Sequence, residues 1–259
     1  MCLVLLAYDT HPEYALVLAA NRDEFYDRPS AAAAFWPDAP DVLGGRDLQA
    51  GGSWLAVDRT GRFAAVTNYR QGQREPAAAH SRGHLISDYL KNRLSAREHI
   101  ERIAAQASQY NGFNLLAGDT ASLFYFSNRE GSVRKLASGI YGLSNHLLDS
   151  AWPKVSHGKE TLSALMNGTE SELVDGLLAF LIDPSRPADH LLPDTGVSLP
   201  WERLLSSAFI ASDDYGTRSS TVLLIARDGN AIFVEQNYSA GGVKAEQNRH
   251  TFKVRQAAA

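Results

Sequence analysis

The chain of 259 residues contains a single cysteine, and that cysteine is the second residue. Initiator methionine is normally removed when the next residue is as small as cysteine. Loss of Met1 would leave Cys2 with a thiol and a free α-amine, whose ordinary pKa values are about 8.5 and about 7.7–8.0. Because the amine can accept the thiol proton at neutral pH, we expect Cys2 to be a nucleophile that carries its own base. The alternative is a small buried hydrophobic residue at the start of a strand.

A second group of reactive side chains is the tetrad Asn21-Arg22-Asp23-Glu24, which directly follows the apolar run 16–20. Two apolar runs, 2–8 and 14–20, predict a hairpin at the N-terminus. The start of its first strand then lies opposite the end of its second, so Cys2 should face residues 20–23. A tetrad carboxylate would hold the amine, and Arg22 would lower the pKa of the thiol. The alternative is a solvated, ion-paired strand end.

Further elements must hold these residues in place. Strand pairs are predicted at 53–58 with 62–68, at 113–118 with 121–127, and at 220–226 with 231–238, the last around the turn dipeptide Asp228-Gly229. Helices are predicted at 82–92, after the capping box at Ser95, at 152–166, and after Thr169-x-x-Glu172. This order indicates an α+β domain with helices packed on antiparallel sheets, and one domain over residues 1–259.

Composition excludes several classes of protein. With 25 Lys and Arg against 29 Asp and Glu, the net charge of −4 provides no positive field for nucleic acid. No apolar run reaches the roughly 18 residues of a membrane span. A lone cysteine cannot form an internal disulfide and indicates a reducing compartment, so we expect a cytoplasmic protein. No metal-binding motif is present. His80 and His84 are four residues apart, but Ser81-Arg82-Gly83 between them argues against a regular helix that presents both to a metal.

The tetrad belongs to a series of short motifs that resembles the NRDE family, the relatives of the transport and Golgi organisation protein. The resemblance spans the whole chain, and its motifs are Met1-Cys2, Asn21-Arg22-Asp23-Glu24 with Phe25-Tyr26 and Arg28-Pro29, Gly51-Gly52-Ser53-Trp54, Thr67-Asn68-Tyr69, Arg82-Gly83, Tyr110-Asn111-Gly112-Phe113-Asn114-Leu115, Tyr141-Gly142-Leu143-Ser144-Asn145 with Trp152 and Lys154, and Tyr215-Gly216-Thr217-Arg218.

The resemblance implies an N-terminal nucleophile hydrolase fold, a four-layer αββα sandwich of two antiparallel sheets between helix layers. Related cysteine acylases of the choloylglycine and penicillin acylase type cleave acyl amides. Carried over from them, Cys2 is the nucleophile, Asn145 and Asn68 are oxyanion donors, and Arg218 stabilises the thiol or the transition state. The resemblance leaves open which acidic residue of the tetrad holds the amine. When the tetrad is aligned with the acylase arginine and aspartate by side-chain type, Arg22 and Asp23 match. When it is aligned by counting back from the following aromatic residue, Asn21 and Glu24 match.

Two functions follow from the resemblance. One is hydrolysis of an acyl amide or thioester through a Cys2 acyl-enzyme, with no cofactor required. The other is non-catalytic binding of haem, or of an acyl-CoA or lipid, in the same cleft. The side chains expected to contact the ligand are Asn21, Glu24, Trp54, Tyr69 and Arg82, with Arg70 and Tyr110 as further candidates, and the candidate axial ligands for haem are Cys2, His84 and His146.

Overall fold

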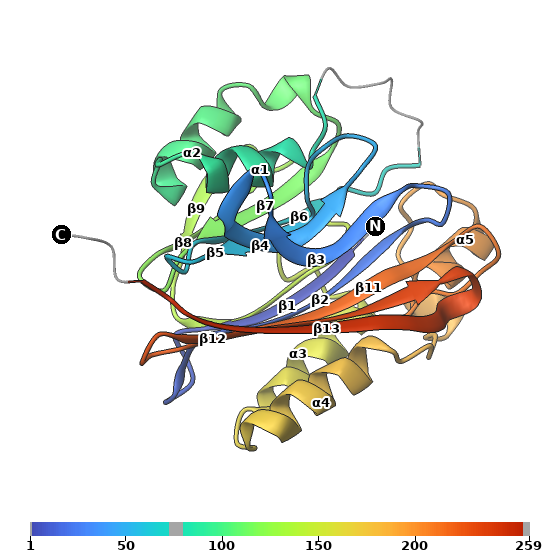
Figure 1. Ribbon diagram of the computed structural model, residues 1–259. Coiled ribbons are helices and arrows are strands. Elements are labelled where there is room, and N and C mark those ends of the chain that lie inside the picture. Colours follow the sequence, from blue (N-terminus) through green and yellow to red (C-terminus); the bar gives the residue numbers. More distant parts are fainter. Residues whose placement is uncertain (1, 73–79, 256–259) are drawn as a thin grey trace.

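The computed structural model describes residues 2–72 and 80–255, and two antiparallel sheets dominate these residues (Figure 1). The six-stranded sheet has the order β10-β1-β2-β11-β12-β13. Its strands are β1 (Cys2–Tyr8), β2 (Tyr14–Phe25), β10 (Gly139–Leu143), β11 (Tyr215–Ala226), β12 (Asn230–Ser239) and β13 (Val243–Lys253). The N-terminal hairpin therefore lies inside this sheet, next to the C-terminal strands.

The seven-stranded sheet follows the chain order from β3 to β9. Its strands are β3 (Ser30–Trp36), β4 (Ala39–Asp47), β5 (Leu55–Asp58), β6 (Phe63–Asn68), β7 (Phe113–Gly118), β8 (Leu123–Ser127) and β9 (Val133–Leu136). Apolar side chains from both sheets, such as Leu6 and Leu116, share one buried core between the sheets.

Helices cover the outer face of each sheet. On the seven-stranded sheet, α1 (His84–Lys91) and α2 (Ala96–Ala104) enclose a second core. On the six-stranded sheet, α3 (Pro153–Leu165) and α4 (Glu170–Leu181) enclose a third. A shorter helix, α5 (Leu199–Leu204), and the 3₁₀ turns Ala107–Gln109, Asp189–Leu191 and Ala240–Gly242 complete the helical elements of residues 2–72 and 80–255. The expected four-layer αββα sandwich is confirmed (Figure 1).

The helix starts and the tight turn that short sequence motifs predict are present in the structure. Both predicted capping boxes are present, at Ser95 before α2 and at Thr169 before α4. Gly229 has a φ of 88°, as the predicted tight turn requires. Within the described part of the chain, no helix is both long and apolar enough to cross a membrane.

Three features of the sheets correct the sequence prediction. The second strand does not end at residue 20: β2 continues to Phe25, so the tetrad lies inside the strand and not beyond it. The strand predicted from residue 220 begins at Tyr215 and pairs with the tetrad. Five strands, β3, β4, β9, β10 and β13, were not predicted.

Candidate functional site

The pairing of β1 with β2 sets the geometry of the site. Cys2 pairs with Arg22, and Leu3 pairs with Asn21, so the register expected from the hairpin is confirmed. Directly opposite residues of an antiparallel pair share a face. Cys2 and Arg22 therefore point together toward the space between the two sheets, at the end of the sandwich where β1 begins.

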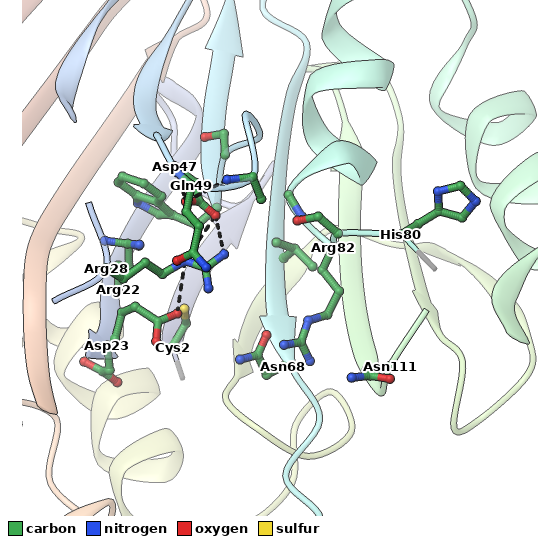
Figure 2. A pocket seen from close by; sticks show the side chains of 17 residues that line it. Cys2, Arg22, Asp23, Arg28, Asp47, Gln49, Asn68, His80, Arg82 and Asn111 are labelled. Carbon is green, nitrogen blue, oxygen red and sulfur yellow. Dashed lines mark hydrogen bonds and ion pairs between the residues drawn. The ribbon is translucent and has the colours of Figure 1, made fainter. Parts of the chain in front are cut away.

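A cavity of about 460 Å³ opens at that position. In Figure 2, Cys2, Arg22 and Asp23 lie on one side of it, and Asn68, Arg82, His80 and Asn111 lie on the other. The remaining lining residues are Glu24, Arg28, Asp47, Gln49, Ala50, Ser53, Trp54, Val66, Ser81 and Gly83. The lining is mostly polar and charged, and both sheets contribute to it.

Cys2 is half-buried, and its surroundings act on the pKa of its thiol in opposite directions. Burial raises the pKa of the thiol, and the negative charge of Asp23 acts in the same direction. The backbone N–H of Asp23, which donates to the sulfur, and the charge of Arg22 lower that pKa. The thiolate is therefore not formed by the surroundings alone, and a base close to the sulfur is needed to take its proton.

Asp23 is the tetrad carboxylate nearest to the start of β1. It is 1% exposed, and its Oδ1 accepts a 2.8 Å hydrogen bond from the Thr217 hydroxyl on β11. Burial raises the pKa of the Asp23 carboxyl, whereas the charge of Lys154 and the hydrogen bond from Thr217 lower it. Glu24, by contrast, lies on the partly exposed rim, 3.9 Å from Arg28. The arrangement favours Asp23 over Glu24 as the partner of a positive charge at Cys2.

Arg22 forms the side wall of the cavity. Its guanidinium stacks on the ring of Trp54 at 4.1 Å and donates to the Ser30 hydroxyl at 3.2 Å. Burial lowers the pKa of Arg22, but an arginine remains charged at physiological pH. The site thus holds a positive charge on the same side of the cavity as the thiol.

The opposite wall is built around the end of β6. Asn68 lines the cavity, and Arg82 donates to the main-chain oxygen of Gly112 at 3.0 Å. Asn145 is fully buried and donates from Nδ2 to the main-chain oxygen of Asn68 at 2.9 Å. Asn145 therefore holds the end of β6 in place and does not itself line the cavity.

Several predicted residues lie outside this cavity. Asn21 points to the helix layer, where its amide donates to the carbonyls of Leu181 and Ala208. Tyr69 packs on His146, with ring centroids 5.1 Å apart. Arg218 donates to the main-chain oxygens of residues 25, 26 and 28 and so holds the turn after β2. Arg70 is in a buried ion pair with Glu202, and neither it nor Tyr110 lines the cavity. The remaining predicted site residues, Cys2, Arg22, Asp23, Glu24, Trp54, Asn68 and Arg82, all line it.

The structure also brings in residues that had no predicted role. Arg28 forms a 2.6 Å ion pair with Asp47, and both line the cavity. Lys154 lies behind Asp23, is 6% exposed and donates to the carbonyl oxygen of Leu205 at 2.8 Å. Burial lowers the pKa of Lys154 to about 8, while the charge of Asp23 opposes that shift. Arg28 and Lys154 both occur in the family motifs. The motifs do not show, however, that Arg28 pairs with Asp47 or that Lys154 lies behind Asp23.

These observations define an αββα sandwich with a cysteine at the head of its first strand and a charged cavity beside it. The family model described as "Transport and Golgi organisation 2" matches residues 1–240. The chain belongs to this family, which confirms the resemblance to the NRDE proteins.

Named relatives match over nearly the whole chain. The "Transport and Golgi organization protein 2 homolog" of Bos taurus is 36% identical over 98% of this chain and 99% of its own. The human protein of the same name is 33% identical, with 92% and 93% covered, and the Drosophila melanogaster "Transport and Golgi organization protein 2" is 29% identical, with 96% of each covered.

Matches among solved structures include two proteins whose names are those of hydrolytic enzymes. A Caenorhabditis elegans "N-acylethanolamine-hydrolyzing acid amidase (NAAA) ortholog" has a TM-score of 0.48 at 12% identity and covers 86% of this chain and 92% of its own. The C2A mutant of conjugated bile acid hydrolase from Clostridium perfringens has a TM-score of 0.46 at 10% identity, with 98% and 92% covered.

Proposed function

We propose that this protein is an N-terminal cysteine hydrolase that cleaves an acyl amide or thioester after loss of Met1. The observation that carries the proposal is the pairing of Cys2 with Arg22, which sets the thiol at a 460 Å³ cavity beside the buried carboxylate of Asp23. A thiol, an adjacent amine and a group that orients the amine are the parts that covalent acyl transfer requires. A reducing compartment such as the cytoplasm would keep the thiol free.

The proposed reaction uses the α-amine of Cys2 as the base. The amine, held by Asp23, takes the proton from Sγ, and the thiolate attacks the acyl carbon. The amide of Asn68, whose strand end is held by Asn145, donates to the developing oxyanion. The ammonium then gives its proton to the leaving amine or thiol, which leaves a thioester on Cys2. Water, deprotonated by the same amine, hydrolyses that thioester.

The binding alternative has less support from the same residues. Of the three candidate axial ligands for haem, Cys2 alone lines the cavity; the imidazole of His84 contacts the carbonyl of Ala50 at 2.7 Å, and that of His146 contacts Ser150 at 2.7 Å. A porphyrin needs broad apolar walls, whereas polar and charged residues together form most of this lining. We therefore prefer a polar acyl substrate over haem.

The test combines intact mass with active-site titration. We expect purified protein to lack Met1 and to release one equivalent of product in a burst from a panel of chromogenic acyl amides and thioesters, with the acyl mass retained on Cys2. The Cys2→Ala protein is the matched control and should show neither the burst nor the adduct. Retained methionine, or a protein without Met1 that forms no adduct with any of these substrates, would overturn the proposal. A Soret band on haem titration that survives in Cys2→Ala would favour the carrier.

A further inference from the structure

A row of four side chains crosses the six-stranded sheet from the proposed nucleophile. Cys2 on β1 is paired with Arg22 on β2, Arg22 with Ser219 on β11, and Ser219 with Asn237 on β12. Residues that lie directly opposite one another share a face of the sheet. The row therefore continues past the cavity at Cys2, along the inner face of the sandwich.

A second cavity of about 290 Å³ lies at the far end of this row. Arg22 and Trp54 line both cavities, so their stacked pair forms the partition between the two. The other residues of the second cavity come from β3, β11, β12 and β13, and they are Ser30, Ala32, Arg218, Ser219, Asn237, Tyr238, Ala245 and Glu246.

A β-bulge places two adjacent residues, Arg218 and Ser219, in the lining of this cavity. The register between β2 and β11 shifts between Thr217 and Ser219, which leaves Arg218 as the extra residue. Bulges redirect side chains and are frequent beside functional sites. Nη1 of Arg218 donates to main-chain carbonyl oxygens at the turn after β2. Its Nε is buried and makes no hydrogen bond within the described residues.

Unused hydrogen-bond donors gather around the second cavity, beside one unused acceptor, Oε2 of the buried Glu235. Ser219 is 1% exposed, and its hydroxyl has no partner in residues 2–72 and 80–255. Arg22 is 5% exposed, and no carboxylate of those residues lies within 4.0 Å of its guanidinium, which donates only to Ser30. Buried donors without acceptors are costly, so their clustering at a cavity indicates a ligand that accepts hydrogen bonds.

We propose that the second cavity binds an anionic oxygen group, a carboxylate or a phosphate, between Arg22, Arg218 and Ser219. Two guanidinium groups and a hydroxyl match the lone pairs of such a group. The carboxylate in the lining belongs to Glu246, which is exposed at the rim on β13. The carboxyl of the fully buried Glu235 accepts from the lining residue Asn237, and burial raises its pKa, which favours its neutral form. Binding at this cavity does not require catalysis. If the proposed hydrolase function is also correct, the substrate carries an anionic group on the far side of the Arg22–Trp54 partition from its acyl carbon.

The test is calorimetric titration of the full chain carrying Cys2→Ala, with inorganic phosphate in one arm and acetate in the other, at low ionic strength. We expect saturable one-to-one binding of at least one anion, and the arm that binds identifies the group. Ser219→Ala removes one donor to a charged ligand and should weaken binding by roughly tenfold. Because Cys2 is absent throughout, a failure of the hydrolase proposal does not affect the result.

A matched pair of variants tests the charge without altering the core. Ala245 is exposed on β13 and lines the cavity, so it tolerates a change of side chain. Ala245→Asp adds a negative charge and should weaken anion binding by roughly tenfold or more, whereas Ala245→Asn, of the same size, should leave it within about twofold. Absence of saturable binding in both arms, or equal affinity in Ala245→Asp and Ala245→Asn, would overturn the proposal.

Discussion

At the scale of single residues, a few buried charges determine what the site can do. Asp23 and Lys154 come from β2 and α3, 131 positions apart in the sequence, and both are almost fully buried. The sequence identifies Cys2, Arg22 and Asp23 because the hairpin register depends on local chain geometry alone. It gives no role to Lys154, because that role depends on how α3 packs on the six-stranded sheet.

Lys154 also predicts how stability depends on pH. Burial lowers its pKa from 10.5 to about 8 in the folded chain. Below pH 8 the lysine is protonated in both states, and the folded state bears the cost of burying the charge. Between about pH 8 and 10.5 the unfolded state binds more protons, so the free energy of unfolding rises with pH, by up to about 3 kcal/mol.

Urea unfolding at several pH values checks this expectation. The difference in the free energy of unfolding between Lys154→Met and the unaltered protein should shift in favour of the unaltered protein as pH rises from 8 to 10. Effects of tyrosine titration are common to both proteins and cancel in the difference. Ser156→Met, exposed on the same helix, is the control and should reproduce the unaltered pH profile. A constant difference for Lys154→Met across this range would contradict the burial of a charged lysine.

At the scale of elements, features that depend on residues close together in the sequence were predicted correctly, whereas features that depend on distant residues were not. The capping boxes of α2 and α4 involve residues three apart, so the sequence displays them directly. The end of β2 could not be located because its polar residues are satisfied by distant ones: Asn21 accepts from Ser220, and Asp23 accepts from Thr217, both on β11. Without knowledge of the partner strand, a polar run inside a strand cannot be distinguished from the end of that strand.

The wall of the first cavity depends on close contact between two elements. The loop between β4 and β5 meets the N-terminus of α1, and Ser53 donates its N–H to the Gly83 carbonyl at 3.2 Å. A Cβ on Gly52 would clash with the main chain of Gly83, which cannot move aside as a side chain can. Gly52→Ala should therefore destabilise the protein by about 1–3 kcal/mol.

Urea unfolding and acyl-enzyme titration together check the effect of Gly52→Ala. We expect slower adduct formation as well as lower stability, because Ser53 and Gly83 both line the cavity. Leu48→Ala in the same loop is 61% exposed and should change the free energy of unfolding by less than about 0.5 kcal/mol. A fully stable Gly52→Ala protein would show that the loop and helix can separate without cost.

At the scale of the whole molecule, the two sheets meet across one apolar core, and both cavities lie where the sheets come together at its polar end. The layered α+β architecture was predictable because strand pairs and capped helices are each visible in the sequence. The family resemblance supplied the two-sheet sandwich, but which strands join which sheet was not predictable, since it depends on the pairing of β2 with β11, whose residues lie about 200 positions apart.

This shared core predicts that the chain unfolds as one unit. Leu6 on β1 and Leu116 on β7 belong to different sheets, yet both are fully buried in the core between them. Leu6→Ala and Leu116→Ala should each cost about 2–5 kcal/mol, and each should lower a single transition that tryptophan fluorescence and far-ultraviolet circular dichroism report at the same urea concentration. Leu191→Ala, 53% exposed, is the surface control. Two separate transitions, with each variant affecting a different one, would mean that the sheets fold independently, and that a site built from both exists only while they stay docked.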